Sequence, residues 1–259
     1  MLIFEITTPG TWLDYEDKDF AWKIKGQLRS LESQFFEANE ALNLFIQATQ
    51  THLALTNQGD RERDSTRLTE ISQLIEGEYG ERLKFNDHRK IMFESEIRLK
   101  REKWAAGEIP KVFSHNRAFL YARAFLYALD AFDKFLNILS NECNVPEQVG
   151  EFHSQFQKSF PDLRSVRNSA AHIEDRARGL GAYGKPLDLK PVANNAINAP
   201  HGGVVILNNL NGSKYGCTKV DGHYGEIDVS IDSMKQLQHI LNGVIQSFNW
   251  TGPLQHAPT

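Results

Sequence analysis

The feature that most constrains the fold is an apolar run over residues 118–132, AFLYARAFLYALDAF. The hexapeptide RAFLYA occurs twice in tandem around it, at 117–122 and 123–128. Six residues do not match the helical period, so the repeat places apolar side chains around the whole helix. The run is too short for a membrane span, and Arg123 and Asp130 interrupt it. It therefore predicts a helix at the centre of a bundle.

Other segments show apolar residues at the three-, four- and seven-residue spacings of amphipathic helices. We expect a long helix that ends before Asn57 and a second helical run over about 61–104, which Gly77 and Gly80 kink or interrupt. The apolar run itself belongs to a third helix at about 114–140. A shorter helix must stop near Pro161, and a last helix follows Asp232.

Composition changes after Gly179, where Gly, Pro and Asn become frequent. Three apolar segments then follow, joined at Asn211-Gly212 and Asp221-Gly222, which predict tight hairpin turns. The predicted fold is mainly α, an up-and-down helical bundle with a small three-stranded antiparallel meander and a C-terminal helix. The expected divisions are a bundle over 1–180 that begins with a short strand, a loop over 181–202, the meander and last helix docked on the bundle over 203–250, and a loose tail over 251–259.

The composition limits the classes of function. With 259 residues and 41% hydrophobic content, the chain is long enough to form a core, and its net charge of −4 provides no general attraction for nucleic acid. The two cysteines, Cys143 and Cys217, form no disulfide framework, and the first residues lack the pattern of a signal peptide. We expect a cytoplasmic protein with no membrane partner.

The segment 166–176, VRNSAAHIEDR, carries the clearest chemical signal. On a continuous helix over 163–177, five apolar residues share the core face: Leu163, Val166, Ala170, Ile173 and Ala177. Arg164, Asn168, His172 and Asp175 fall together on the opposite face, and Arg167 lies between the two faces. His172 is therefore predicted to point away from the core.

Two interpretations of this polar face remain open. It can be a solvated helix surface with internal salt bridges. Alternatively it meets a second subunit, and the small residues Ser169, Ala170 and Ala171 allow two Arg/His sets to approach across a twofold axis. The spacing of Arg and His is uninformative by itself, because roughly 0.5 such pairs are expected by chance in a chain of this composition.

The sequence Arg167-Asn168-Ser169-Ala170-Ala171-His172 resembles the signature of HEPN domains, helical bundles with Arg, a polar residue, a spacer and His on a late helix. The resemblance implies a homodimer whose paired Arg and His line a metal-independent ribonuclease site, often in toxin–antitoxin or phage-defence systems. It implies RNA as substrate and a cognate antitoxin as a partner. Some HEPN domains are non-catalytic, so a binding module for a protein, nucleotide or RNA is the alternative.

The chemistry agrees with these residue types. Histidine exchanges protons near neutral pH and can act as base or acid, while arginine grips phosphate oxygens. Asn168, one turn before His172, is expected to fix the imidazole or contact substrate. Substrate-backbone contacts are expected from Arg164, Arg176 and Arg178, and the RLKREK run at 98–103 is a weaker candidate that usually forms a solvated face.

The other motifs in the sequence give little indication of function. GLGAYG at 179–184 has the spelling of a dinucleotide-binding loop, but it follows a helix where a strand is required. The remaining histidines show no zinc-ligand spacing, so we expect neither a metal nor a cofactor.

Overall fold

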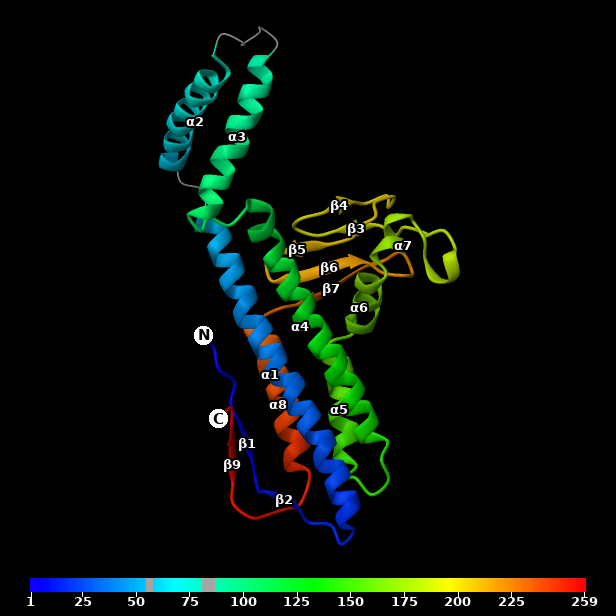
Figure 1. Ribbon diagram of the computed structural model, residues 1–259. Coiled ribbons are helices and arrows are strands. Elements are labelled where there is room, and N and C mark those ends of the chain that lie inside the picture. Colours follow the sequence, from blue (N-terminus) through cyan, green and yellow to red (C-terminus); the bar gives the residue numbers. More distant parts are fainter. Residues whose placement is uncertain (55–57, 81–86) are drawn as a thin grey trace. The chain divides into compact units, whose positions relative to one another are not determined.

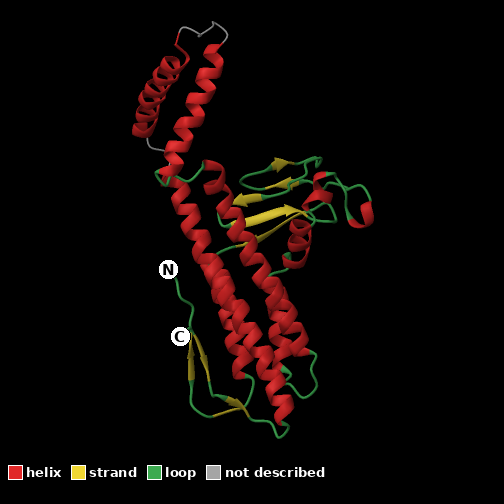
Figure 2. Cartoon of the chain, in the orientation of Figure 1, coloured by secondary structure: helices red, strands yellow, loops and turns green. Residues whose placement is uncertain are grey.

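A computed structural model describes residues 1–54, 58–80 and 87–259 of the chain. For residues 51–54 and 58–60 it describes the backbone only. The chain forms two compact units, one of residues 1–46 and 118–259 and the other of residues 47–117. The second unit lies within the range 1–180 expected for the bundle, and residues 203–250, expected to dock on the bundle, belong to the first unit. The fold is mainly α with small antiparallel sheets, as predicted (Figure 2).

The first unit is built around four helices, labelled in Figure 1: α1 (Lys18–Ala54) up to residue 46, α4 (Lys111–Ser140) from residue 118, α5 (Gln148–Ser159) and α8 (Ile231–Gln246). Each buries an apolar stripe with the helical spacing. Phe132 of α4 stacks on Phe156 of α5, with ring centroids 5.5 Å apart. The core has fully buried side chains from all four helices: Leu28, Leu31, Phe35, Leu42, Phe125, Leu129, Leu136, Val149, Phe156, Leu237 and Leu241.

Helix α4 is less enclosed than its sequence predicts. Its face with Phe125, Leu129 and Phe132 is buried, but Leu120 and Tyr127 remain exposed. Ile138 is exposed further along the helix. The tandem repeat therefore gives the helix a second apolar face, which remains partly exposed.

Two short helices, α6 (Leu163–Ala171) and α7 (Ile173–Ala177), follow α5 and lead to the predicted meander. Strands β5 (Asn209–Asn211), β6 (Lys214–Thr218) and β7 (Tyr224–Asp228) pair antiparallel in that order. Gly212 and Gly222 adopt φ of 64° and 85° in the two connections, which confirms both turns. Residues 204–208 were expected to join the first strand, but only Ile206 is bonded to β6, through Thr218.

The loop before the meander contains the short pair β3 (Val192–Ala193) and β4 (Asn198–Ala199) and the 3-10 turn Ala182–Gly184. No nucleotide-binding strand–turn–helix unit forms around 179–184.

The chain ends pair with each other, which corrects the prediction of a loose tail. Strand β9 (Gln255–Ala257) pairs with β1 (Ile6–Thr8), and β8 (Trp250–Thr251) pairs with β2 (Trp12–Leu13). Gly10 has no room for a side chain there, because a Cβ would lie 2.6 Å from the Thr251 carbonyl oxygen.

The second unit contains α2 (Gln58–Tyr79) and α3 (His88–Ala105), where one interrupted helical run was expected. Gly80, with φ of 53°, follows the end of α2. Ile71, Ile75 and Ile91 form a small core between the helices. The ion pairs Arg67–Glu102 and Arg98–Glu78 also join them.

None of the described helices combines the length and apolar character that crossing a bilayer demands.

Candidate functional site

Helix α6 positions the candidate residue Arg167, because the helix face away from Arg167 is buried. Leu163, Val166 and Ala170 are buried, as the helical pattern predicts. The helix packs on β6 and β7 of the meander, and the Cys217 thiol of β6 donates to the Val166 carbonyl at 3.7 Å. Asp162 occupies the N-cap position, but its carboxylate pairs with Lys219 at 2.9 Å and does not cap the helix.

Arg167 is anchored by an acidic residue of α4. Its Nε lies 2.9 Å from Oδ1 of Asp130, a carboxylate whose side chain is 8% exposed. The Nε–H direction does not satisfy hydrogen-bond geometry, so the contact is an ion pair only. Lys134 donates to the other oxygen of Asp130 at 2.6 Å. Asp130 thus holds the Nε end of the Arg167 guanidinium, and the Arg167 side chain as a whole is 22% exposed.

The predicted continuous helix over 163–177 is wrong, because it breaks at His172. This residue has φ of −116° and ψ of 46°, outside the helical region, and α7 begins at Ile173 in a new direction. Arg176 of α7 turns inward after the break. Ile173 is consequently half-buried and Ala177 exposed, so the predicted core face ends at Ala170.

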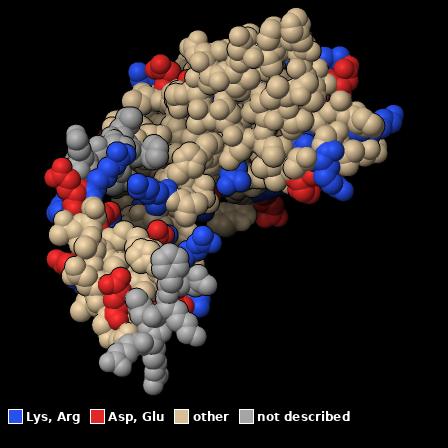
Figure 3. Space-filling model, turned by 90° about the horizontal axis from the view of Figure 1, so that it is seen from above, with Lys and Arg blue, Asp and Glu red and all other residues tan. Residues whose placement is uncertain are grey.

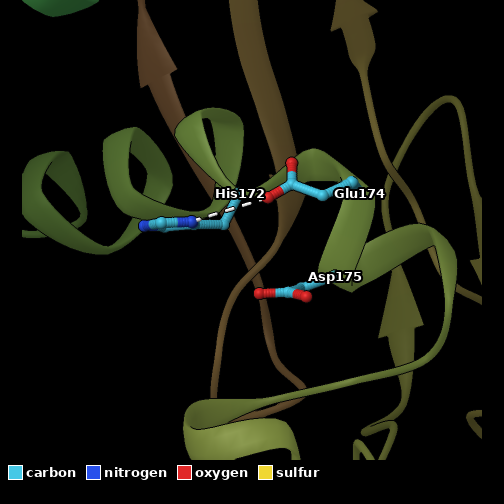
Figure 4. A group of neighbouring side chains, drawn as sticks. All are labelled: His172, Glu174 and Asp175. Carbon is cyan, nitrogen blue, oxygen red and sulfur yellow. Dashed lines mark ion pairs between the residues drawn. The ribbon is translucent and has the colours of Figure 1, made fainter.

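His172 is exposed, as expected, with 63% of its side chain accessible. Its nearest charged partner is Glu174, with Nδ1 and Oε1 3.7 Å apart (Figure 4). Asp175 lies beside them, and one donor atom from each of the three residues falls within 4.8 Å of the others. Imidazole nitrogen and carboxylate oxygens are donors that zinc takes, but exposed acidic groups often lie together without a metal, and this spread is wider than that of ligands on one zinc ion.

Asn168 is half-buried one turn before His172, and its backbone carbonyl accepts the His172 N–H at 3.1 Å. Among the described residues, no hydrogen bond links its side-chain amide to the imidazole. Contact of Asn168 with the imidazole is therefore not seen in this structure, and its contact with substrate stays a prediction.

The three arginines expected to follow a substrate backbone have different surroundings. Arg164 is exposed on α6. Arg178 is exposed and pairs with Asp175 at 2.5 Å. Arg176 is only 5% exposed and donates to the Ser169 hydroxyl and the Leu180 carbonyl. Because its guanidinium is used internally, Arg176 is better explained as a structural residue.

On the face shown in Figure 3, blue basic groups and red acidic groups are scattered among large uncharged areas. The RLKREK run illustrates this mixing: Arg98 pairs with Glu78 and Glu94, and Lys103 pairs with Asp64 and Glu108. The RLKREK run therefore forms a solvent-exposed, ion-paired surface, which is the more common role of such a run.

Asp130 is the site residue that motif reading missed. The sequence contained a signal for it, because a carboxylate inside an apolar helix needs a cationic partner when buried. His153 of α5, whose Nε2 lies 3.0 Å from Oδ1 of Asp133, was also not singled out.

No known protein family, curated protein or solved structure matches the chain. The functional assignment therefore depends on the motif residues and their geometry.

Proposed function

We propose that the protein is a HEPN-like, metal-independent endoribonuclease whose active site is completed by two copies of the chain, in the manner of toxin or phage-defence nucleases. In this proposal Arg167 binds the scissile phosphate and His172 transfers protons. Asn168 contacts the substrate, and the exposed Arg164 and Arg178 bind the flanking backbone.

The observation that carries the proposal is the placement of Arg167. The Asp130 carboxylate fixes the Nε end of the side chain, while the two terminal nitrogens have no hydrogen-bond partner among the described residues. A guanidinium held in this way has little freedom left to lose on binding and presents its fork to a phosphate.

His172 supports the same chemistry because its ring is accessible at the break between α6 and α7. Cleavage through the RNA 2′-hydroxyl needs one group to take a proton and another to donate one. A single chain provides one such histidine in the motif. A twofold partner would provide the second.

The exposed stripe of α4 supports a homodimer. Leu120, Ala124 and Tyr127 lie on one side of the helix at spacings of four and three residues. Tyr127 is less than one turn before Asp130, which contacts Arg167. In the proposed dimer a second copy packs on this stripe about a twofold axis near Tyr127, so that the two Arg167 side chains approach each other, and burial of the stripe removes apolar surface from water.

The test is cleavage of RNA by the purified full chain in excess EDTA. We expect cleavage to persist, and a fully 2′-O-methylated RNA to resist because it lacks the nucleophile. His172→Ala and Arg167→Ala should each reduce the rate by at least about 100-fold, within the usual range for loss of an acid/base group. The matched control is His223→Ala, because His223 is also exposed and lies 3.4 Å from a carboxylate, that of Asp221. It should cut normally.

Asp130→Asn addresses the anchoring of Arg167. As a positioning residue, Asp130 should affect kcat more than KM, and circular dichroism should confirm that helicity is retained. Loss of all cleavage in EDTA, or normal rates in the His172→Ala protein, would refute the nuclease proposal. A strict monomer at assay concentrations would refute the composite site.

The alternative, a non-catalytic HEPN-like binding module, is favoured by one observation. His172 already has Glu174 and Asp175 beside it, which makes the surface near the ring acidic in a single copy. If the module only binds RNA, the intact substrate should be retained in a mobility-shift assay, and Arg167→Ala should weaken retention while His172→Ala has little effect.

A further inference from the structure

A cavity of about 470 Å³ lies at the start of α1, within the first unit and on elements other than α6 and α7. Its lining comes from the segment before α1, from one face of the first two turns of α1 and from β8. The residues are Trp12, Leu13, Asp14, Lys18, Ala21, Trp22, Lys25 and Thr251. The volume is within the range of about 300–1,000 Å³ typical of small-ligand sites.

Two tryptophans at this cavity are unusually exposed. Trp12 is 56% exposed and Trp22 is 67% exposed, although large aromatic side chains are normally mostly buried. Trp22 projects from α1, whereas Trp12 belongs to β2. Exposed indole faces at a cavity are stacking surfaces for planar rings.

Lys25 adds a buried positive charge. The residue is 8% exposed, its Nζ donates to the Thr11 carbonyl at 2.5 Å, and the same atom lies 4.5 Å from the centre of the Trp12 ring. No carboxylate is within ion-pair distance of this nitrogen in the described part of the chain. Burial and then Arg29 lower the pKa of Lys25, and the opposing effect of Glu32, which lies beyond ion-pair distance, is smaller.

The remaining polar groups determine which ligand fits. Lys18 adds a second positive charge, and Asp14 provides a carboxylate that can accept hydrogen bonds from hydroxyl or amino groups. A cationic ligand is disfavoured, because Lys25 already occupies a face of Trp12 and the two lysines would repel it. A ligand with a planar ring, an anionic group and a hydroxyl matches every part of the lining.

We propose that this cavity binds a nucleotide, with the base stacked on the indoles of Trp12 and Trp22 and the phosphate beside Lys18 and Lys25. In this arrangement the phosphate supplies the counter-ion that Lys25 lacks, and Asp14 accepts from the ribose. The proposal does not depend on the ribonuclease activity, since the two sites share no residue.

The test is titration of the full chain with adenosine 5′-monophosphate, followed by tryptophan fluorescence and by calorimetry. We expect saturable binding with quenching of the indole emission. Ribose 5-phosphate lacks the base and should bind much more weakly. Trp22→Ala should reduce affinity by at least about fivefold, the lower end of the effect of removing one stacking ring. Trp104→Ala is the matched control, because Trp104 is exposed on α3 outside the cavity, and it should bind normally.

The phosphate contacts are tested with Lys18→Met, since Lys18 is exposed and its loss should not disturb the fold. This variant should weaken adenosine monophosphate binding while leaving the weaker binding of adenosine unchanged. Lys23→Met, from another side of the same helix, is its control. Lys25→Met should show the same selectivity, and circular dichroism will establish that the protein remains folded.

The ligand can be a free nucleotide or one unit of an RNA strand. A short RNA oligonucleotide, titrated into the His172→Ala protein so that it stays intact and keeps its 2′-hydroxyls for Asp14, separates these sources: tighter binding than the mononucleotide supports a strand, and weaker binding supports a free nucleotide. The proposal is overturned by an absence of saturable binding at millimolar nucleotide or by normal binding in the Trp22→Ala protein. It is also overturned if an uncharged sugar such as ribose binds as tightly as adenosine monophosphate.

Discussion

Tyr215 is fully buried on β6, and its hydroxyl oxygen has no hydrogen-bond partner within the described residues. Burial also raises the pKa of this phenol, so it remains neutral. An unpaired buried hydroxyl costs about 1–3 kcal/mol. We therefore expect Tyr215→Phe to increase the free energy of unfolding by up to about 1 kcal/mol, measured by urea denaturation. A clear loss of stability would instead reveal an important partner of the hydroxyl.

Cys217 is predicted to be unreactive while the protein is folded. Burial raises the pKa of its thiol from 9.0 to about 12. In a Cys143→Ser variant at pH 9, the remaining thiol should react with a disulfide reagent roughly a thousandfold more slowly than after unfolding in urea, because thiolate is the reacting form. Rapid labelling of the folded protein would contradict this burial.

The same shift has a defined effect on stability. Because the folded pKa lies above the unfolded value, the contribution of Cys217 is complete below about pH 9 and is lost as pH rises toward 12. The free energy of unfolding should therefore decrease over this range, and Cys217→Ala should reduce the slope.

At the scale of elements, the contact between α5 and α8 depends on Gly243. A Cβ at this position would lie 2.1 Å from Cζ of Phe152, so the ring occupies the space a side chain would need. We expect Gly243→Ala to destabilise the protein by about 1–3 kcal/mol despite the better helix propensity of alanine. Chemical denaturation measures the change.

Two further variants isolate the cause. Adding Phe152→Leu to Gly243→Ala should restore part of the lost stability by relieving the clash. Gly26→Ala is the matched control, since this helical glycine has open space around it and should gain up to about 1 kcal/mol. Equal effects at Gly26 and Gly243 would show that packing against Phe152 is not responsible.

At the scale of the whole molecule, the pairing of the chain ends is predicted to contribute to stability. Thr11 donates to the Thr251 carbonyl at 2.9 Å, and the Trp250 indole donates to the Ile245 carbonyl at 2.8 Å. Deletion of residues 250–259 removes these bonds together with β8 and β9. We expect the unfolding temperature to fall by about 4–8 °C, as for a loss of about 2 kcal/mol. An unchanged temperature would mean that the tail contributes nothing.

Sequence reading was most successful where structure depends on nearby residues. The apolar spacing of α1, α5 and α8 identified these helices, because burial along one face follows directly from the helical period. Asn211-Gly212 and Asp221-Gly222 located both turns of the meander, since positive φ is a local property of glycine. The exposure of His172 was also predicted correctly, from its position relative to Val166 and Ala170.

The remaining features depend on contacts between residues that are distant in the sequence. The pairing of Arg167 with Asp130 joins α6 to α4, and the pairing of β9 with β1 joins the two ends of the chain. The break between α6 and α7 at His172 is a local exception, because no glycine or proline there signals it. Helical period and turn chemistry are set within a few residues, so the sequence by itself determined the helices and the hairpins. Only the tertiary structure decided which charges are buried, because burial depends on what packs against each side chain.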